Sequence, residues 1–354
     1  MNTPHRTLTD MRRHAAKISQ APPRRNLHEF MKAILVFIDG TICDTRLREV
    51  FFGTADFYQC EKVLEDSPVQ RSVECLKDLS QRYEIVYIGA RPDYTRSITE
   101  EWLRKMGYPE GELHLAESQE ERLSLIDKMT GKHDFIAGIG DRWDDNELHS
   151  KIGCLSIILQ EYAGKWDSVA DRIELHHRKS KVAENRIHLK GKVEGLARIC
   201  PLLLSKYGGQ LWDAYLGSVL EMAEITREAR RTEDLAAFAK NGLDPNDLRD
   251  AAKLDELLRE EDWENNSVYG LQSFELVEET KDRYVHKVTY CYYSELWKEQ
   301  GRPDIGYQIH CRTDMAWWDR PAWNPKVRFE QPKTLMQGQD CCVFIQSITK
   351  NTIT

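Results

Sequence analysis

The chain of 354 residues is long enough for about two domains, and its content of 41% hydrophobic and 31% charged residues is typical of a soluble globular protein. No apolar run approaches the roughly 18 residues that a membrane-spanning helix needs, and a net charge of −8 argues against a general nucleic-acid binder. Nine cysteines, with no apolar secretory signal in residues 1–30, predict reduced thiols and a cytoplasmic protein. These features favour a small-molecule partner and leave the oligomeric state open.

Residues 1–30 are rich in arginine and poor in acidic residues, which predicts a disordered basic tail. An organellar targeting segment has a similar composition and is the alternative interpretation.

Residues 31–175 alternate between short apolar strands and amphipathic helices, a pattern that favours a parallel sheet with crossover helices. The first three expected strands end at polar motifs, and ligands of open α/β sheets bind at the carboxyl ends of strands. We therefore expect an α/β domain whose site, if it has one, lies at these ends. The expected strands are 33–38, 84–88, 135–139 and 155–159.

The second half of the chain shows a different order of elements. Residues 176–192 are basic and polar and are expected to link the first domain to a second one at 193–354. Helical spacing is followed by a hairpin and then by two helices and two strands, an order that predicts an α+β domain. The expected helices are 193–231, 247–259, 294–300 and 304–315, and the expected strands are 274–279, 284–290, 326–330 and 342–348.

The first strand runs directly into Asp39, Gly40 and Thr41. This stretch resembles the first motif of the haloacid dehalogenase (HAD) superfamily, an apolar run followed by Asp-x-Asp-Gly-Thr. In that family the first Asp attacks phosphorus and the second acts as a general acid and base. Here Asp39 stands at the second position and Phe37 at the first. A phenyl ring cannot form an aspartyl-phosphate, so the resemblance implies a HAD-like Rossmannoid fold without the usual chemistry.

Two further segments resemble the HAD pattern. Residues 85–92 carry Gly89 where the family has a hydroxyl, followed by Arg91, a candidate substrate-binding residue. Residues 135–145 match an apolar strand followed by Gly-Asp-x-x-x-Asp. The resemblance implies that three carboxylates face the strand ends and could hold Mg²⁺ through oxygen ligands: Asp39, Asp141 and Asp145.

A second resemblance covers about 193–350 and is concentrated in roughly the last 65 residues. Segments 290–301, 305–314, 324–338 and 342–344 are similar to the L-2-amino-thiazoline-4-carboxylic acid hydrolase family. That family has a Cys before a helix, a Cys-x-x-Asp, an Asn-Pro strand and a closing Cys-Asp-Phe, and Val343 departs from it where Asp is usual. The resemblance implies hydrolytic opening of a cyclic, amidine-like thiazoline to an N-carbamoyl amino acid.

Cys311 and Asp314 carry the chemistry of this second resemblance. They lie three residues apart, so on a helix they share a face. A thiolate could add to the ring carbon while Asp314 pairs with the protonated amidine. Cys342 is a further catalytic candidate, and His286 or Glu295 could supply a base from another element. Arg312, Lys326 and Arg328 could receive a substrate carboxylate, for which arginine is the better suited, and Asn324 is a further candidate to bind substrate.

The sequence leaves three functions open. The favoured one is a hydrolase of a small cyclic C–N compound, fused to a degenerate HAD-like domain. The second is a Mg²⁺-dependent HAD phosphatase of a small phosphate ester or nucleotide. The third is a non-catalytic binding or regulatory protein built on two decayed enzyme domains. A zinc site is an open alternative for the soft ligands His310, Cys311, Cys341 and Cys342.

Overall fold

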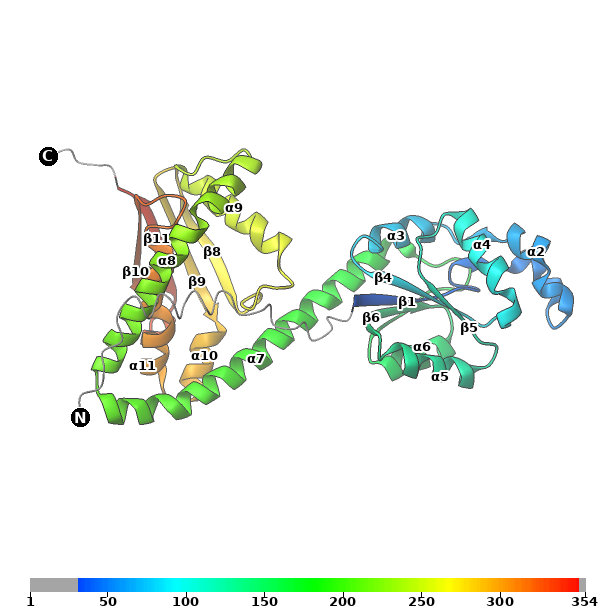
Figure 1. The fold of residues 1–354 in the computed structure, drawn as a ribbon, viewed down its shortest axis with the longest axis horizontal. Helices are drawn as coiled ribbons and strands as arrows, with labels where there is room; N and C mark the ends of the chain where they lie inside the picture. Colours follow the sequence, from blue (N-terminus) through cyan, green and yellow to red (C-terminus); the bar gives the residue numbers. More distant parts are fainter. Residues whose placement is uncertain (1–30, 350–354) are drawn as a thin grey trace. The chain divides into compact units, whose positions relative to one another are not determined.

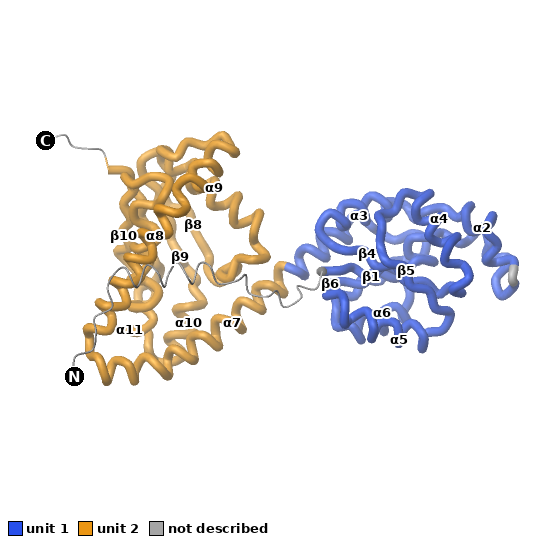
Figure 2. The backbone as a smooth tube through the Cα atoms, viewed as in Figure 1, with its two compact units in different colours: residues 1–177 blue, residues 178–354 orange. Residues whose placement is uncertain are grey.

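The computed structural model describes residues 31–349, so the expected basic tail lies outside the described residues (Figure 1). The chain divides into two compact units, Met1–His177 and Arg178–Thr354 (Figure 2). The fold class expected from the sequence, a parallel α/β domain followed by an α+β domain, is confirmed. Within residues 31–349, no helix combines the length and the apolar character needed to cross a membrane.

Unit 1 is built on a five-stranded parallel sheet in the order β5-β4-β1-β6-β7. Its strands are almost wholly apolar because helices cover both faces of the sheet, with α3 and α4 on one side and α5 and α6 on the other (Figure 1). The strands are β1 Met31–Phe37, β4 Glu84–Gly89, β5 Glu112–Leu115, β6 His133–Gly140 and β7 Leu155–Ile158. The helices are α2 Cys60–Glu65, α3 Ser72–Leu79, α4 Arg96–Met106, α5 Gln119–Met129 and α6 Trp143–Ile152, and a short pair, β2 Cys43–Asp44 and β3 Ser67–Pro68, precedes α3.

The end of helix α4 and strand β5 illustrate what local sequence does and does not indicate in unit 1. Helix α4 ends at Gly107, whose φ of +82° suits the left-handed cap that glycine adopts easily, as the sequence indicated. Strand β5 was missed, because four residues at a sheet edge with alternating burial give almost no periodic signal.

Helix α7, Val169–Tyr207, corrects the expectation of a linker at 176–192. These residues are helical, and the division between the two compact units falls among them, after His177. Asn185 is buried in unit 2, where its amide donates to the carbonyl oxygens of Asn266 and Tyr269 at 3.0 and 3.1 Å. A long helix with many charged residues has the same composition as a linker. Composition alone therefore does not distinguish the two.

Unit 2 contains a four-stranded antiparallel sheet in the order β10-β11-β9-β8. The expected hairpin and the strand at 342–348 are present, and α9 lies where an exposed helix was expected. The strands are β8 Gln272–Glu279, β9 Arg283–Cys291, β10 Val327–Lys333 and β11 Cys342–Ile348. The helices are α8 Gln210–Lys240, α9 Leu248–Glu261, α10 Tyr292–Glu299, α11 Pro303–Gly306 and α12 Arg312–Trp318.

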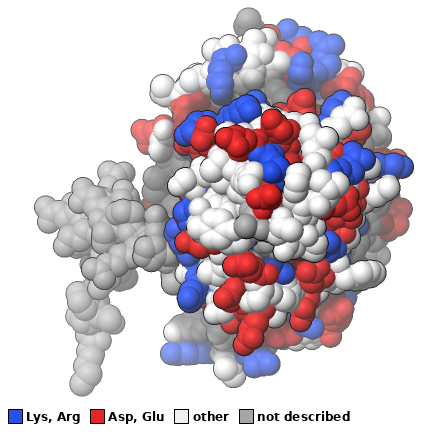
Figure 3. Space-filling model, turned by 90° about the vertical axis from the view of Figure 1, so that its right-hand side faces the viewer, with Lys and Arg blue, Asp and Glu red and all other residues white. Residues whose placement is uncertain are grey.

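The face drawn in Figure 3 carries basic and acidic side chains interspersed around uncharged ones. This face therefore offers no extended surface of a single sign.

Candidate functional site

Cys311 and Asp314 lie on a helical segment that changes its winding just before them. Pro303 begins α11, and a π-helical turn, Tyr307–Cys311, leads into α12. A π-turn redirects the side chains that follow it and often occurs at functional sites. Because Asp314 follows Cys311 by three positions, from the end of the π-helical turn into α12, their side chains occupy neighbouring positions on one helix face.

Asp314 is partly buried. Its carboxyl accepts a hydrogen bond from the side-chain amide of Gln331 on β10, at 3.0 Å. Burial raises the pKa of Asp314 to about 7, and the Gln331 hydrogen bond opposes this shift only in part. Near neutral pH the carboxyl therefore exists in both protonation states. A group of that kind can give and take a proton, which is what general acid–base catalysis requires.

The thiol of Cys311 has the opposite character. Burial raises its pKa far above the usual value, and the charges of Asp314, Cys342 and Cys291 raise it further. Tyr293 packs against both the core cluster beside which Cys311 lies and the core cluster that contains Cys291 and Cys342. These three thiols and Asp314 therefore lie in one region of unit 2, the thiol cluster, and Cys311, Asp314 and Cys342 are the catalytic candidates that the sequence had named.

Cys342 and Cys291 are held at the rim of this cluster by hydrogen bonds to sulfur. The backbone N–H of Leu335 donates to Cys342 Sγ at 3.2 Å, and the Gln272 side-chain amide donates to Cys291 Sγ at 3.6 Å. Both thiols are buried, at 4% and 9% exposure. They are therefore placed to shape the cluster rather than to react first.

Three residues of unit 2 that were expected to bind substrate make other contacts. Arg312 donates to Gln308 and to Asp213, at 2.9 and 3.2 Å. Arg328 donates to the carbonyl oxygens of residues 325 and 327. Asn324 is buried and closes a turn, donating to the carbonyl oxygen of residue 245 and accepting from the Lys326 N–H. Their contacts are structural.

The nearby histidines are neutral at pH 7. Burial lowers the pKa of His310 to about 4, and its ring lies 4.6 Å from the ring of Tyr293. Burial likewise lowers the pKa of His286 to about 4, and its ring stacks on Phe344 at 5.0 Å. Glu295, the other candidate base, accepts from the Tyr290 hydroxyl at 3.2 Å. Asp314 is thus better suited than any of these to exchange protons near neutral pH.

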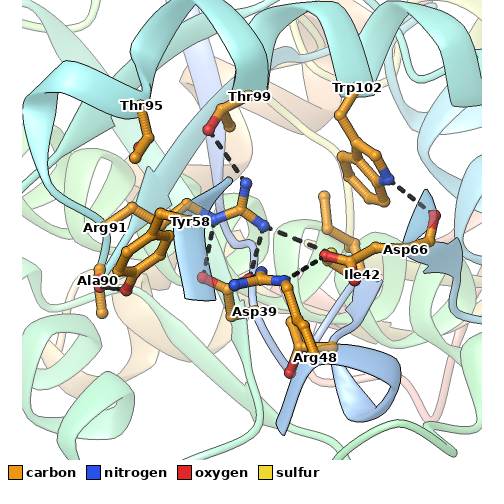
Figure 4. A network of polar contacts seen from close by, with 12 residues as sticks. Asp39, Ile42, Arg48, Tyr58, Asp66, Ala90, Arg91, Thr95, Thr99 and Trp102 are labelled. Carbon is orange, nitrogen blue, oxygen red and sulfur yellow. Dashed lines mark hydrogen bonds and ion pairs between the residues drawn. The ribbon is translucent and has the colours of Figure 1, made fainter. Parts of the chain in front are cut away.

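At the strand ends of unit 1, Phe37 and Asp39 occupy very different surroundings. Phe37 is buried in the core beneath α5 and α6, with its ring 5.6 Å from that of His149. The Asp39 carboxylate receives a two-pronged pair from Arg91, at 2.9 and 2.6 Å, and a third hydrogen bond from Arg48 at 3.0 Å (Figure 4). Burial alone would raise the pKa of Asp39, but Arg91 and then Arg48 outweigh it, so the pKa lies below the usual value.

The same two arginines tie the short insert after β1 to the sheet. Arg48 also donates to Asp66 at 2.8 Å, and Arg91 donates to the Thr99 hydroxyl at 3.0 Å. The side chains of Arg48, Arg91 and Asp66 are at most 1% exposed. Asp39, Asp66 and the two arginines form a chain of alternating charge that is balanced internally. Arg91, a substrate-binding candidate from the sequence, is therefore committed to this chain.

The carboxylates expected to hold Mg²⁺ do not fit that ion as they are placed. Asp39 faces two guanidinium groups, and Asp141 accepts from the Thr41 hydroxyl. Asp145 caps α6 by accepting from the N–H groups of Asp141 and Arg142, both at 3.0 Å. Burial raises the pKa of Asp141 to about 6 and that of Asp145 to about 7. Across residues 31–349, no three His, Cys, Asp or Glu side chains converge in a way that could hold a metal ion.

Comparison with known proteins places a family likeness in the second half of the chain. The model of the L-2-amino-thiazoline-4-carboxylic acid hydrolase family matches residues 206–345, which include Cys311, Asp314 and Cys342. No curated protein sequence matches the chain.

Two solved structures show a distant likeness. A chain of the Pnkp1/Rnl/Hen1 complex is 17% identical with a TM-score of 0.32, over 38% of this chain and 47% of that one, so the match spans about half of that protein. A class C acid phosphatase from Bacillus anthracis, with tungstate bound, is 20% identical with a TM-score of 0.31, over 47% of this chain and 78% of that one. Likenesses this distant support no functional conclusion.

Proposed function

We propose that unit 2 hydrolyses a small cyclic C–N compound of the amidine or thiazoline type at Cys311 and Asp314. The observation that carries the proposal is the meeting of a thiol and a proton-exchanging carboxyl on one helix face. Both lie within the segment that matches the hydrolase family model. Unit 1, with its charge-balanced strand ends, would serve as a scaffold.

The protonation states suit the first step of such a reaction. Asp314 can transfer its proton to the basic ring nitrogen, which leaves an amidinium–carboxylate pair and makes the ring carbon more electrophilic. The Cys311 thiol then adds to that carbon as the Asp314 carboxylate takes its proton. The thiol does not need to be ionised beforehand, which agrees with its raised pKa.

The remaining steps regenerate the enzyme. The carbon–sulfur bond of the ring breaks, and the leaving sulfur takes the proton that Asp314 holds. Water then adds to the amidine carbon still bonded to Cys311, with Asp314 accepting one of its protons. Cleavage of the bond to Cys311 returns the thiol and releases an N-carbamoyl product. Gln331 would hold the Asp314 carboxyl in place throughout.

The test is ring opening of 2-amino-thiazoline-4-carboxylate by the purified full chain, followed as the N-carbamoyl product by mass spectrometry. We expect Cys311→Ala to abolish turnover and Asp314→Asn to lower kcat by about 10²–10⁴-fold, the usual loss for a general acid–base group. Cys60→Ala is the thiol control, because Cys60 is an exposed free cysteine on α2 of unit 1. We expect this variant to keep full activity.

Two outcomes would contradict the proposal. One is product formation at an unchanged rate in Cys311→Ala. The other is Mg²⁺-dependent release of phosphate from an aryl phosphate that is lost in Asp39→Asn, which would move the active site to unit 1. The geometry gives no support to the latter reaction, because Phe37 supplies no nucleophile and Asp39 is engaged by two arginines.

A further inference from the structure

Unit 2 contains a half-open groove of about 1000 Å³, bounded by α8, α9, α12 and one face of the sheet. A volume of this size is at the upper end of the range of about 300–1000 Å³ for small-molecule pockets. It is also much larger than a single five-membered ring requires. The residues that line it belong to unit 2 alone.

The floor of the groove continues toward the thiol cluster. Phe344 pairs with His286, and the next pair on the same face along these strands is Cys342 with Val288. Two residues of strand span roughly 7 Å, so Cys342 lies about one side chain beyond the His286 end of the groove.

Helix α12, which forms one wall of the groove, also contacts the residues around Cys342. Trp318 lines the groove and also packs against the core cluster that contains Cys291 and Cys342. Asp314 lies four residues before Trp318 on α12, so the two side chains share a helix face. Trp318 therefore connects the groove to the core cluster that contains Cys291 and Cys342.

The walls are aromatic and partly open to solvent. Phe274, Leu276 and Trp317 line the groove and are 48%, 54% and 47% exposed. Large apolar side chains that remain this exposed together often mark a binding surface. The His286 ring centroid lies 5.4 Å from that of Phe274 and 5.7 Å from that of Tyr284, with the ring planes inclined by 61° and 53°, so the floor is aromatic.

Three of the arginines that line the groove have acidic partners. Arg259 contacts Asp255 at 2.7 Å, and Arg230 contacts Asp234 at 3.3 Å. Arg227 pairs with Glu224 and donates to the carbonyl oxygen of Ala316 at 2.6 Å. The whole lining carries five basic and six acidic side chains, so its charges nearly cancel and the groove favours a ligand without net charge.

We infer that this groove binds the larger, non-reacting part of the substrate, a neutral ring system bigger than one five-membered ring, and directs its reactive C–N end toward Cys311 and Asp314. The inference rests on the proposed function for the identity of the reacting end. The size and chemistry of the non-reacting part of the substrate are inferred from the groove itself.

The test compares two neutral probes by calorimetry with the full chain. 2-Aminobenzothiazole carries the aminothiazole ring fused to a benzene ring, whereas 2-aminothiazole lacks the second ring, and neither is a hydrolysable thiazoline. We expect 2-aminobenzothiazole to bind at least tenfold more tightly. We expect Leu276→Glu, which places a charge in the groove, to weaken that binding by about tenfold or more, equivalent to about 1.4 kcal/mol.

The matched control is Leu257→Glu on α9. Leu257 is 43% exposed and is not among the residues that line the groove, so binding should be unchanged. Equal affinities for the two probes, or equal binding by Leu276→Glu and the native chain, would overturn the inference. Binding that is sensitive to Leu276→Glu without turnover of the thiazoline would disprove the proposed function alone. Turnover of the thiazoline without such binding would disprove the inference about the groove alone.

Discussion

Two carboxyl groups show how their surroundings set their charge. Asp39 receives three hydrogen bonds from two arginines and is held as an anion, whereas Asp314 receives one from an uncharged amide and has a pKa raised by burial to about 7. Asp39 is the more prominent residue in the sequence because it sits in a recognisable motif. Asp314 is the one whose protonation state can change near neutral pH.

The raised pKa of Asp314 predicts a specific pH dependence of stability. Its pKa in the folded chain is about 7, above the value of about 3.9 in an unfolded chain. Between these values the folded state binds a proton that the unfolded state releases, so the stabilisation is complete below about pH 4 and is lost as the pH rises through 7. Asp314→Asn removes this dependence.

The measurement is urea unfolding of Asp314→Asn and the native chain from pH 5 to 8. We expect the variant to become progressively more stable relative to the native chain, with a slope of up to about 1.4 kcal/mol per pH unit. A difference that does not vary with pH would show that the carboxyl titrates normally.

The charge chain around Asp39 predicts a rescue experiment. Asp39→Ala removes the carboxylate that pairs with two buried arginines, Arg48 and Arg91. This loss should destabilise the protein by about 3–5 kcal/mol. Formate is small enough to replace the missing carboxylate, so it should raise the melting temperature of the variant more than an equal concentration of chloride does. The native chain should show neither this formate effect nor a shift with Mg²⁺. Stabilisation of the native chain by Mg²⁺ that is lost in Asp39→Asn would instead support a metal site.

At the scale of elements, the approach of α11 to α10 depends on a glycine. A Cβ at Gly306 would lie 2.5 Å from Trp297 Cγ and 2.8 Å from Met336 Sδ, distances that real side chains do not tolerate. Trp297 is fully buried, so it has little room to move. The π-helical turn that positions Cys311 begins directly after Gly306.

We therefore expect Gly306→Ala to destabilise the protein by about 1–3 kcal/mol through overpacking, although alanine is the better helix former. Gly217→Ala in α8 is the control, because a Cβ there meets nothing within 4 Å. That change should stabilise by up to about 1 kcal/mol. Thermal unfolding of both variants is the measurement, and equal effects of the two substitutions would contradict the packing argument.

At the scale of the molecule, each of the two candidate sites draws on residues of a single unit. The charge chain uses residues of Met1–His177, and the thiol cluster with its groove uses residues of Arg178–Thr354. Each unit also has two hydrophobic core clusters made of its own residues. The residues proposed to carry the chemistry of unit 2 therefore all belong to unit 2.

The sequence by itself determined what depends on neighbours along the chain. The buried strands of unit 1, the hairpin of unit 2 and the strand Cys342–Ile348 follow from local periodicity. The shared face of Cys311 and Asp314 follows from helical spacing.

Only the tertiary structure decided which distant groups meet. The sequence does not reveal that Arg48 reaches Asp39 and Asp66, that Gln331 reaches Asp314, or that three helices and the sheet of unit 2 leave a groove open. These contacts depend on sheet order, helix packing and the burial that shifts each pKa, and such quantities arise only when segments far apart in the chain are packed together.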